Sequence, residues 1–218
     1  MSADAWSLLF KAFWETLYMV TFSGGISFLL GIPLGVLLYV TREGHILENR
    51  AANLVLGGGV NVGRSIPVII LMVAIIPLTR LLTGTSIGTT AAIVPLTVAA
   101  IPFVARIAEG ALNEVPSGLV EAAQSMGASP LQIVTRVLLP EASPSLINGM
   151  TITLVTLVSY SAMAGAIGGG GLGDLGIRYG YQRFDGVIML ATVVVLIALV
   201  QLLQMIGDCL QQHYDRSH

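Results

Sequence analysis

Long uncharged apolar stretches, separated by short polar segments, occupy most of the chain. The first, 17–40, has 24 residues without a charged side chain, and the last, 186–207, has 22. A helix rises about 1.5 Å per residue, so about 20 apolar residues cross a hydrocarbon core of roughly 30 Å. The pattern predicts five transmembrane helices, at 17–40, 54–80, 87–106, 144–166 and 186–207.

Two of these predicted spans are interrupted. The second contains an apolar run of only 15 residues, 65–79, which is short for a crossing. We therefore extend it back to Leu54, so that it contains Arg64, whose side chain is expected to reach toward the cytoplasmic surface. The third contains Pro95 and Pro102, which predict a bent helix that is buried among its neighbours.

The composition places this pattern in a membrane. Hydrophobic residues make up 55% of the chain and charged residues 10%, against roughly 25% charged residues in soluble domains. We predict an all-α integral membrane protein in a lipid bilayer. The formal net charge of −2 and the lack of a basic cluster in the sequence argue against nucleic acid as a partner. The single cysteine, Cys209, leaves no internal disulfide.

The polar segment between the third and fourth spans predicts two short helices joined at a glycine. Ser117 is placed to cap the first helix and Gly127 to end it, because glycine adopts a left-handed conformation without strain. Ser129 and Gln132 have the spacing of a capping box at the start of the second helix. Pro140 is expected to end that helix.

The stretch 121–140, EAAQSMGASPLQIVTRVLLP, carries the pattern of a known family. Its order of Glu-Ala-Ala, three residues, Gly, nine residues, Val, one residue and Leu-Pro resembles the cytoplasmic EAA loop of bacterial ABC-importer permeases. In that family isoleucine is usual at the position of Val137. The resemblance implies the type I ABC-importer permease fold, with 107–143 as a cytoplasmic coupling loop on which an ATPase docks. The implied docking and coupling residues are Glu121, Ala122, Ala123, Gly127, Arg136, Leu139 and Pro140.

Two glycine-rich motifs match nucleotide-binding patterns outside the context that those patterns need. Gly58–Ser65 fits GxxxxGK[ST] except that Arg64 replaces lysine, and 171–176 fits GxGxxG. Both patterns need a preceding strand in a soluble βα unit, whereas here they lie beside predicted membrane helices. We interpret the first as a helix-packing surface and the second as part of a glycine- and tyrosine-rich loop, 167–185.

The glycine-rich loop and the fourth span bear on the substrate. The run Ala164–Phe184, AGAIGGGGLGDLGIRYGYQRF, resembles the corresponding loop of methionine-importer permeases more closely than it resembles that of other ABC importers. In the fourth span, Ser159, Tyr160 and Met163 bring polar and polarizable groups to membrane depth. Such groups either line a cavity or find partners on neighbouring helices, so a translocation path and ordinary helix packing are both open. The thioether of Met163 suits a path for methionine.

The resemblance implies the transmembrane permease subunit of an ATP-driven methionine importer, with the stereoisomer left open. It also implies a homodimer, two copies of an ABC ATP-binding subunit and an extracytoplasmic methionine-binding protein. ATP and Mg belong to the ATPase, so this chain is expected to bind no cofactor or metal and to catalyse no reaction. The expected location is the bacterial inner membrane, with the N-terminus outside and the C-terminus in the cytoplasm. Basic residues alone, five inside against four outside, favour that orientation only slightly.

Three alternatives stay open. The same architecture would suit another amino acid, a short peptide or an osmolyte as substrate. An ion-coupled secondary transporter is disfavoured, because the predicted spans contain no acidic residue for ion coupling. A channel or scaffold subunit without a pumping role would purify without an ATPase partner.

Overall fold

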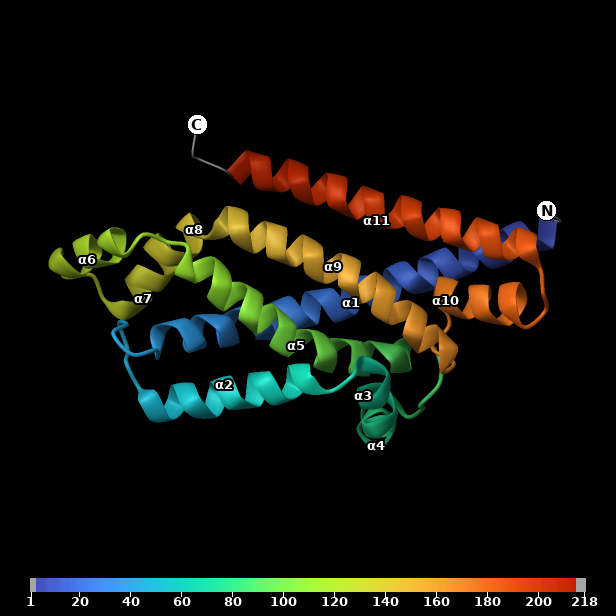
Figure 1. Cartoon of the computed structure of the whole chain (residues 1–218), viewed down its shortest axis with the longest axis horizontal. Helices are drawn as coiled ribbons and strands as arrows, with labels where there is room; N and C mark the ends of the chain where they lie inside the picture. Colours follow the sequence, from blue (N-terminus) through green and yellow to red (C-terminus); the bar gives the residue numbers. More distant parts are fainter. Residues whose placement is uncertain (1–2, 215–218) are drawn as a thin grey trace.

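The structure, a computed structural model, describes residues 3–214, with side chains from residue 5 onward; the predicted permease domain, 1–218, extends beyond it at both ends. All regular secondary structure in this described part is helical (Figure 1). The helices, in chain order, are α1 Ala3–Val40, α2 Arg50–Ser65, α3 Val68–Ala74, α4 Ile76–Thr83, α5 Thr89–Asn113, α6 Ser117–Ser125, α7 Pro130–Ile133, the π-helical η1 Val134–Leu138, α8 Leu139–Glu141, α9 Ser143–Ala166, α10 Gly171–Leu175, the π-helical η2 Gly176–Tyr181 and α11 Gly186–Tyr214.

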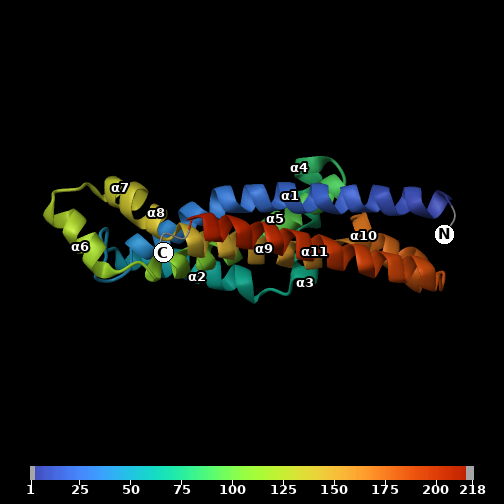
Figure 2. The ribbon, with the colours of Figure 1, turned by 90° about the horizontal axis from the view of Figure 1, so that it is seen from above.

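Helices α1, α5, α9 and α11 run along the long axis of the molecule and form a bundle (Figures 1 and 2). Helix α5 is central, because 61% of its most apolar 18-residue window is buried, against 17% for α11. Pro95 and Pro102 lie inside α5 without ending it, and both are buried. The prediction that this helix is buried among its neighbours is confirmed.

The packing of α1 on α5 depends on two glycines. A Cβ added to Gly35 would lie 2.5 Å from the carbonyl oxygen of Ala105, and one added to Gly31 would lie 2.7 Å from the Cβ of Val104. Both distances are shorter than a van der Waals contact, so a larger residue would push the helices apart. The two backbones therefore approach closely, and this contact fixes α1 in the bundle.

The second predicted span, 54–80, is not one straight helix. Helix α2 ends at Ser65, and α3 begins at Val68 after a bend of 99°. Pro67 has no N–H to donate and favours an extended conformation in the preceding Ile66, whose ψ is 123°. The described residues therefore contain four helices long and apolar enough to cross a membrane, or five spans if the bent pair α2–α3 counts as one.

The glycine- and tyrosine-rich segment 167–185, predicted as a loop, contains the short helices α10 and η2. Its start is held by α1: the N–H of Gly171 donates to Glu15 Oε2 at 2.9 Å, and the N–H of Leu172 donates to Thr16 Oγ1 at 2.8 Å. These two side chains satisfy N–H groups that the first turn of a helix leaves unpaired. The loop prediction is wrong because the capping groups come from a helix 156 residues earlier in the chain.

Candidate functional site

The segment α6–α8 lies at the end of the bundle opposite the N-terminus (Figure 1). Helix α6 ends as predicted at Gly127, whose φ is +78°. The N–H of Gly127 donates to the carbonyl of Gln124 at 2.9 Å, and the N–H of Ala128 donates to that of Ala123 at 3.1 Å. This pair of bonds is a Schellman motif, so the glycine both ends α6 and sets the direction in which the chain leaves it.

The start of the second short helix is also as predicted. The N–H of Ser129 donates to Gln132 Oε1 at 2.8 Å, and the N–H of Gln132 donates to Ser129 Oγ at 3.4 Å, which completes the capping box. The predicted cap at Ser117 is wrong. Pro116 occupies the cap position of α6, no side chain caps that end, and Ser117 is the first residue of the helix.

The prediction that Pro140 ends the second helix is wrong. The chain stays helical through η1 and α8 to Glu141. The N–H of Leu139 donates to the carbonyl of Val134, five residues back, so the backbone is locally widened into a π-helix. An α-helical register would bring the ring of Pro140 against the carbonyl of Arg136, and the widened turn accommodates the ring.

Buried apolar side chains hold this segment on the end of the bundle. Ala123, Ile133 and Leu138 belong to one buried cluster with Leu112 and Leu146 from the long helices α5 and α9. Ile133 is 1% exposed and Leu138 is fully buried. The segment is therefore a packed part of the structure, and a force on α6 or α7 reaches α5 and α9 through this buried cluster.

The seven predicted docking residues divide by exposure. Ala123 is buried and Leu139 is partly buried, so these two hold the segment to the bundle. The remaining five are exposed: Glu121, Ala122, Gly127, Arg136 and Pro140. Neither charged side chain among them forms an ion pair with another described residue. A partner can therefore reach both charges.

The sequence reasoning missed three exposed apolar side chains on the same surface. Leu119 is 42% exposed, Met126 81% and Leu131 72%. Large apolar side chains that remain exposed beside charged ones are typical of a protein interface. A signal was present, because Leu119 in α6 and Met126 at its C-cap are large apolar residues in a segment that also contains Glu121, Gln124 and Ser125.

Two of the three predicted path residues lie together in one pocket. Ser159 and Met163 line an open pocket of about 660 Å³ between α3, α9 and α11, and Met163 is 44% exposed. Tyr160 is partly buried against a core cluster that includes Met19 and Leu157, and it is not part of the pocket lining.

Residues from other helices complete this pocket. Sequence reasoning missed Ile69 from α3 and Gln201 from α11. Gln201 was recognisable as an amide within the 22 uncharged residues of the last span. Apart from Ser159 and Gln201, the lining side chains are apolar. Such a surface suits a small ligand that is mostly apolar with a few polar groups.

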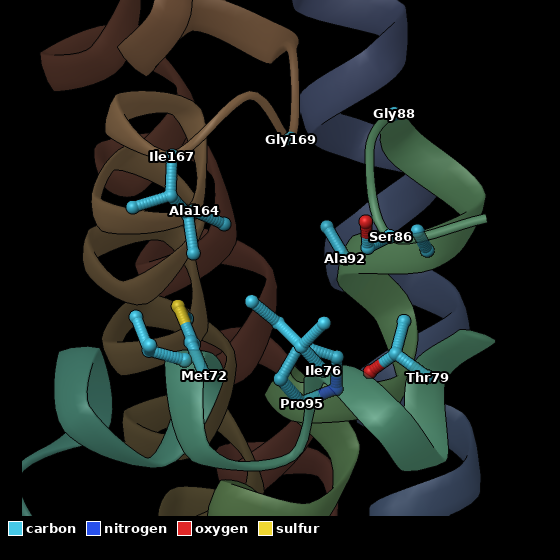
Figure 3. Close-up of a pocket in the computed structure, with 12 residues that line it drawn as sticks. Met72, Ile76, Thr79, Ser86, Gly88, Ala92, Pro95, Ala164, Ile167 and Gly169 are labelled. Atoms are coloured by element: carbon cyan, nitrogen blue, oxygen red, sulfur yellow. The ribbon is translucent and has the colours of Figure 1, made fainter.

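A second cavity lies deeper in the bundle and is much smaller. It measures about 60 Å³ and is lined by residues of α3, α4, α5, the end of α9 and the adjoining loops. Figure 3 shows Ala164 and Ile167 on one side of it and Thr79 and Ser86 on the other. This volume has room for a few water molecules. In this conformation the pocket at Ser159 and Met163 is therefore the candidate ligand site, and the small cavity is not.

A charged cluster joins α5 to α2. Arg106 Nη1 lies 2.6 Å from Glu109 Oε2, and Arg106 Nη2 donates to Asn61 Oδ1 at 2.8 Å and to the carbonyl of Gly57 at 3.3 Å. Both charges are therefore satisfied within one copy of the chain. Within the described residues no group of three or more His, Cys, Asp or Glu side chains is arranged to hold a metal.

The chain matches the family of binding-protein-dependent transport system inner membrane components over residues 31–217. It belongs to this family, and the permease class predicted from the EAA loop is confirmed. The protein is therefore a multi-helix inner-membrane component of a transport system.

Individual relatives narrow the comparison. The probable D-methionine transport system permease protein MetI of Vibrio cholerae is 64% identical over 208 residues, which cover 95% of this chain and 92% of that protein. The protein of the same name from Pasteurella multocida is 51% identical over 215 residues, 99% of each chain.

Solved structures extend the likeness to the fold. A chain of the MetNI methionine ABC transporter, in an inward-facing conformation, matches with a TM-score of 0.98 at 53% identity, over 99% of this chain and 100% of that one. A chain of an amino acid ABC transporter matches with a TM-score of 0.77 at 17% identity, over 98% and 100% of the two chains, and shares the fold. The predicted type I ABC-importer permease fold is confirmed.

Proposed function

We propose that this chain is the membrane-spanning subunit of an ATP-driven importer and forms the translocation path for methionine. The observation that carries this proposal is the match with a chain of the MetNI methionine ABC transporter over 99% of the present chain at 53% identity. The relatives named for D-methionine transport support the same substrate.

Energy enters through the surface of α6 and α7. Two ATP-binding subunits dock on the two copies of this surface, where Glu121 and Arg136 offer free charges and Leu119, Met126 and Leu131 offer apolar contacts. ATP and Mg are bound and used by those subunits, and this chain catalyses no bond chemistry. The docking surface lies in the cytoplasm, so the N-terminus of α1, at the opposite end of the bundle, lies outside (Figure 1).

Substrate passes between two copies of the chain. The pocket lined by Ser159 and Met163 is open on the surface of one copy, and a second copy would close it from the other side. Tyr160 packs behind these residues against the core, so its role is to position α9 rather than to contact substrate. A binding protein on the outer side delivers methionine to this path.

Uptake by the reconstituted complex tests the proposal. The permease, its ATP-binding subunit and the binding protein are assembled in vesicles, and uptake of labelled methionine is measured with and without ATP. We expect uptake that depends on ATP, survives an ionophore and is reduced by unlabelled methionine more than by other amino acids. Uptake that needs no ATP but collapses with the ionophore would identify a secondary transporter instead.

A further inference from the structure

Arg64 is an exposed arginine in the last turn of α2, next to the 99° bend between α2 and α3. Its side chain has no hydrogen bond or ion pair with any residue that the structure describes. By contrast, Arg106 is paired with Glu109, and Arg178 is paired with Asp174. Arg64 is therefore a free cation on the surface of a single copy.

Although Arg64 is exposed, it lies along the bundle axis at the level of apolar residues, far from the start of α2. Its neighbour Gly63 packs against α5, because a Cβ added to Gly63 would lie 3.1 Å from the ring of Pro102. Gly63 and Pro102 line one groove together with Leu34 of α1. Leu34 is six residues from the end of the uncharged run at Val40, which is about 9 Å along the helix. Arg64 itself is 14 residues from the start of α2, about 21 Å. An arginine side chain is shorter than either distance, so Arg64 does not reach the inner membrane surface.

One polar side chain lies beside Arg64 on α2. Asn61, one turn earlier, is also exposed, and its Oδ1 accepts a hydrogen bond from Arg106. That bond leaves the amide nitrogen of Asn61 as a second donor beside Arg64. Helix α1 packs against α2 through Leu38 and Val60, and elsewhere it exposes Phe22 and Leu29, as a lipid-facing surface does. A charge facing lipid at this depth is costly, so we infer that the α2 face is directed toward the path between two copies.

A cation at this depth needs an anion, and the chain supplies few. The acidic side chains described on the long helices are Glu15, Glu109 and Asp208. Glu15 accepts a backbone N–H from α10 and lies 3.8 Å from Lys11, and Glu109 is paired with Arg106. Asp208 follows the apolar run of α11 and is the remaining acidic group of this described set. A second copy adds only the same groups, so a ligand that carries a negative charge fits best.

We propose that Arg64, with Asn61 beside it, binds the carboxylate of the substrate as it crosses the membrane. This assignment rests on the proposed function, since it places a binding group in the path used by that substrate. A planar guanidinium donates two parallel hydrogen bonds to one carboxylate, and it supplies the counter-charge that a carboxylate needs in an apolar setting. The ligand class is a small molecule with a free carboxylate, and the thioether plays no part at this position.

Chemical modification of the assembled wild-type complex tests the assignment directly. Phenylglyoxal reacts with free guanidinium groups, and mass spectrometry of the α2 peptide measures its reaction at Arg64 and at Arg50 separately. At a saturating concentration, methionine and norleucine should slow the reaction at Arg64 by about fivefold or more, whereas methioninamide should not, and Arg50 should not respond. If Arg64 reacts with phenylglyoxal at the same rate in the presence of methionine as in the presence of methioninamide, the assignment is overturned. It is also overturned if only anionic lipid protects Arg64 from the reagent.

Uptake by variants provides the second test. Arg64→Gln should lower ATP-driven methionine uptake by about tenfold or more, since a hydrogen bond between charged groups is lost, and Arg64→Lys should fall between. Arg50→Gln, at the inner end of the same helix, is the matched control and should transport normally. Thermal unfolding of each complex checks its folding.

Three outcomes of this experiment separate the explanations. If Asp208→Asn lowers uptake as much as Arg64→Gln, and the double variant loses no more, the anion is Asp208 of the second copy and the proposal fails. If the wild type takes up no methionine, the proposed function itself fails. If the wild type transports and Arg64→Gln transports equally well, only the carboxylate assignment fails.

Discussion

Gly127 offers the sharpest test of the docking role proposed for the segment α6–α8, because a substitution there changes backbone strain and little else. Its φ is +78°, and a Cβ added to it would meet nothing within 4 Å. Gly118, at the start of α6, has the same open surroundings but an ordinary φ. Gly127→Ala and Gly118→Ala therefore add the same methyl group to the same surface, and only the first forces alanine into the left-handed region.

The expected effects on stability follow from the backbone conformations of the two glycines. Alanine in the left-handed region costs about 1–2 kcal/mol, so Gly127→Ala should weaken the Schellman bond from Ala128 to Ala123 by about 5–30-fold in equilibrium terms. Gly118→Ala should stabilise α6 by about 0.5–1 kcal/mol, because alanine is the better helix former. The two variants thus shift the same helix in opposite directions.

Amide hydrogen exchange and ATPase binding measure the two consequences. The N–H of Ala128 should exchange about 5–30-fold faster in Gly127→Ala than in the wild type, and no faster in Gly118→Ala. The affinity of the permease for the ATP-binding subunit should fall by no more than the same factor of about 5–30, because the population of the docking conformation falls only by that factor. If both variants exchange and dock alike, the left-handed turn does not set the docking geometry and the reasoning is refuted.

Three further substitutions test the docking charge, the helix contact and the path. Glu121→Lys should weaken binding of the ATP-binding subunit by roughly tenfold, as a reversed interface charge does, without changing membrane insertion; unchanged co-purification would contradict this. Gly35→Ala should destabilise the protein by about 1–3 kcal/mol through overpacking, whereas Gly25→Ala, with nothing within 4 Å of the added carbon, should not; thermal unfolding compares them. Met163→Asp should reduce methionine uptake more than Leu190→Asp on the exposed face of α11, and equal losses would return Met163 to a packing role.

The sequence predicted best where the interactions are local. The turn at Gly127 and the capping box of Ser129 and Gln132 use bonds between residues no more than five positions apart, so their residue types are sufficient evidence. The prediction that Pro140 ends the helix is wrong, although it also rests on a local sequence signal. Its effect depends on the π-helical register of η1, and no residue type in Val134–Leu138 announces that register.

The larger misses depend on contacts between distant segments. The helix α10 starts where Glu15 and Thr16 of α1 accept its first N–H groups, and the sequence gives no sign that these residues meet. The second predicted span had a local signal in Pro67, but the 99° bend that follows it comes from the packing of α3 on the bundle. Apolar periodicity predicts that helices exist, while their direction after a break is a tertiary property.

Within the helix α9, the surroundings of the predicted path residues also depend on tertiary packing. Tyr160 and Met163 are three residues apart, about 60° around the helix axis, and that rotation separates the core cluster from the open pocket.

The same helix joins the two functional regions. It begins at Ser143, directly after α8 of the coupling segment and the buried Ala142. Met163 follows Ser143 by 20 residues, about 30 Å of helix. If an ATPase docks on α6 and α7 as proposed, a displacement of these helices would reach the pocket through the rigid helix α9.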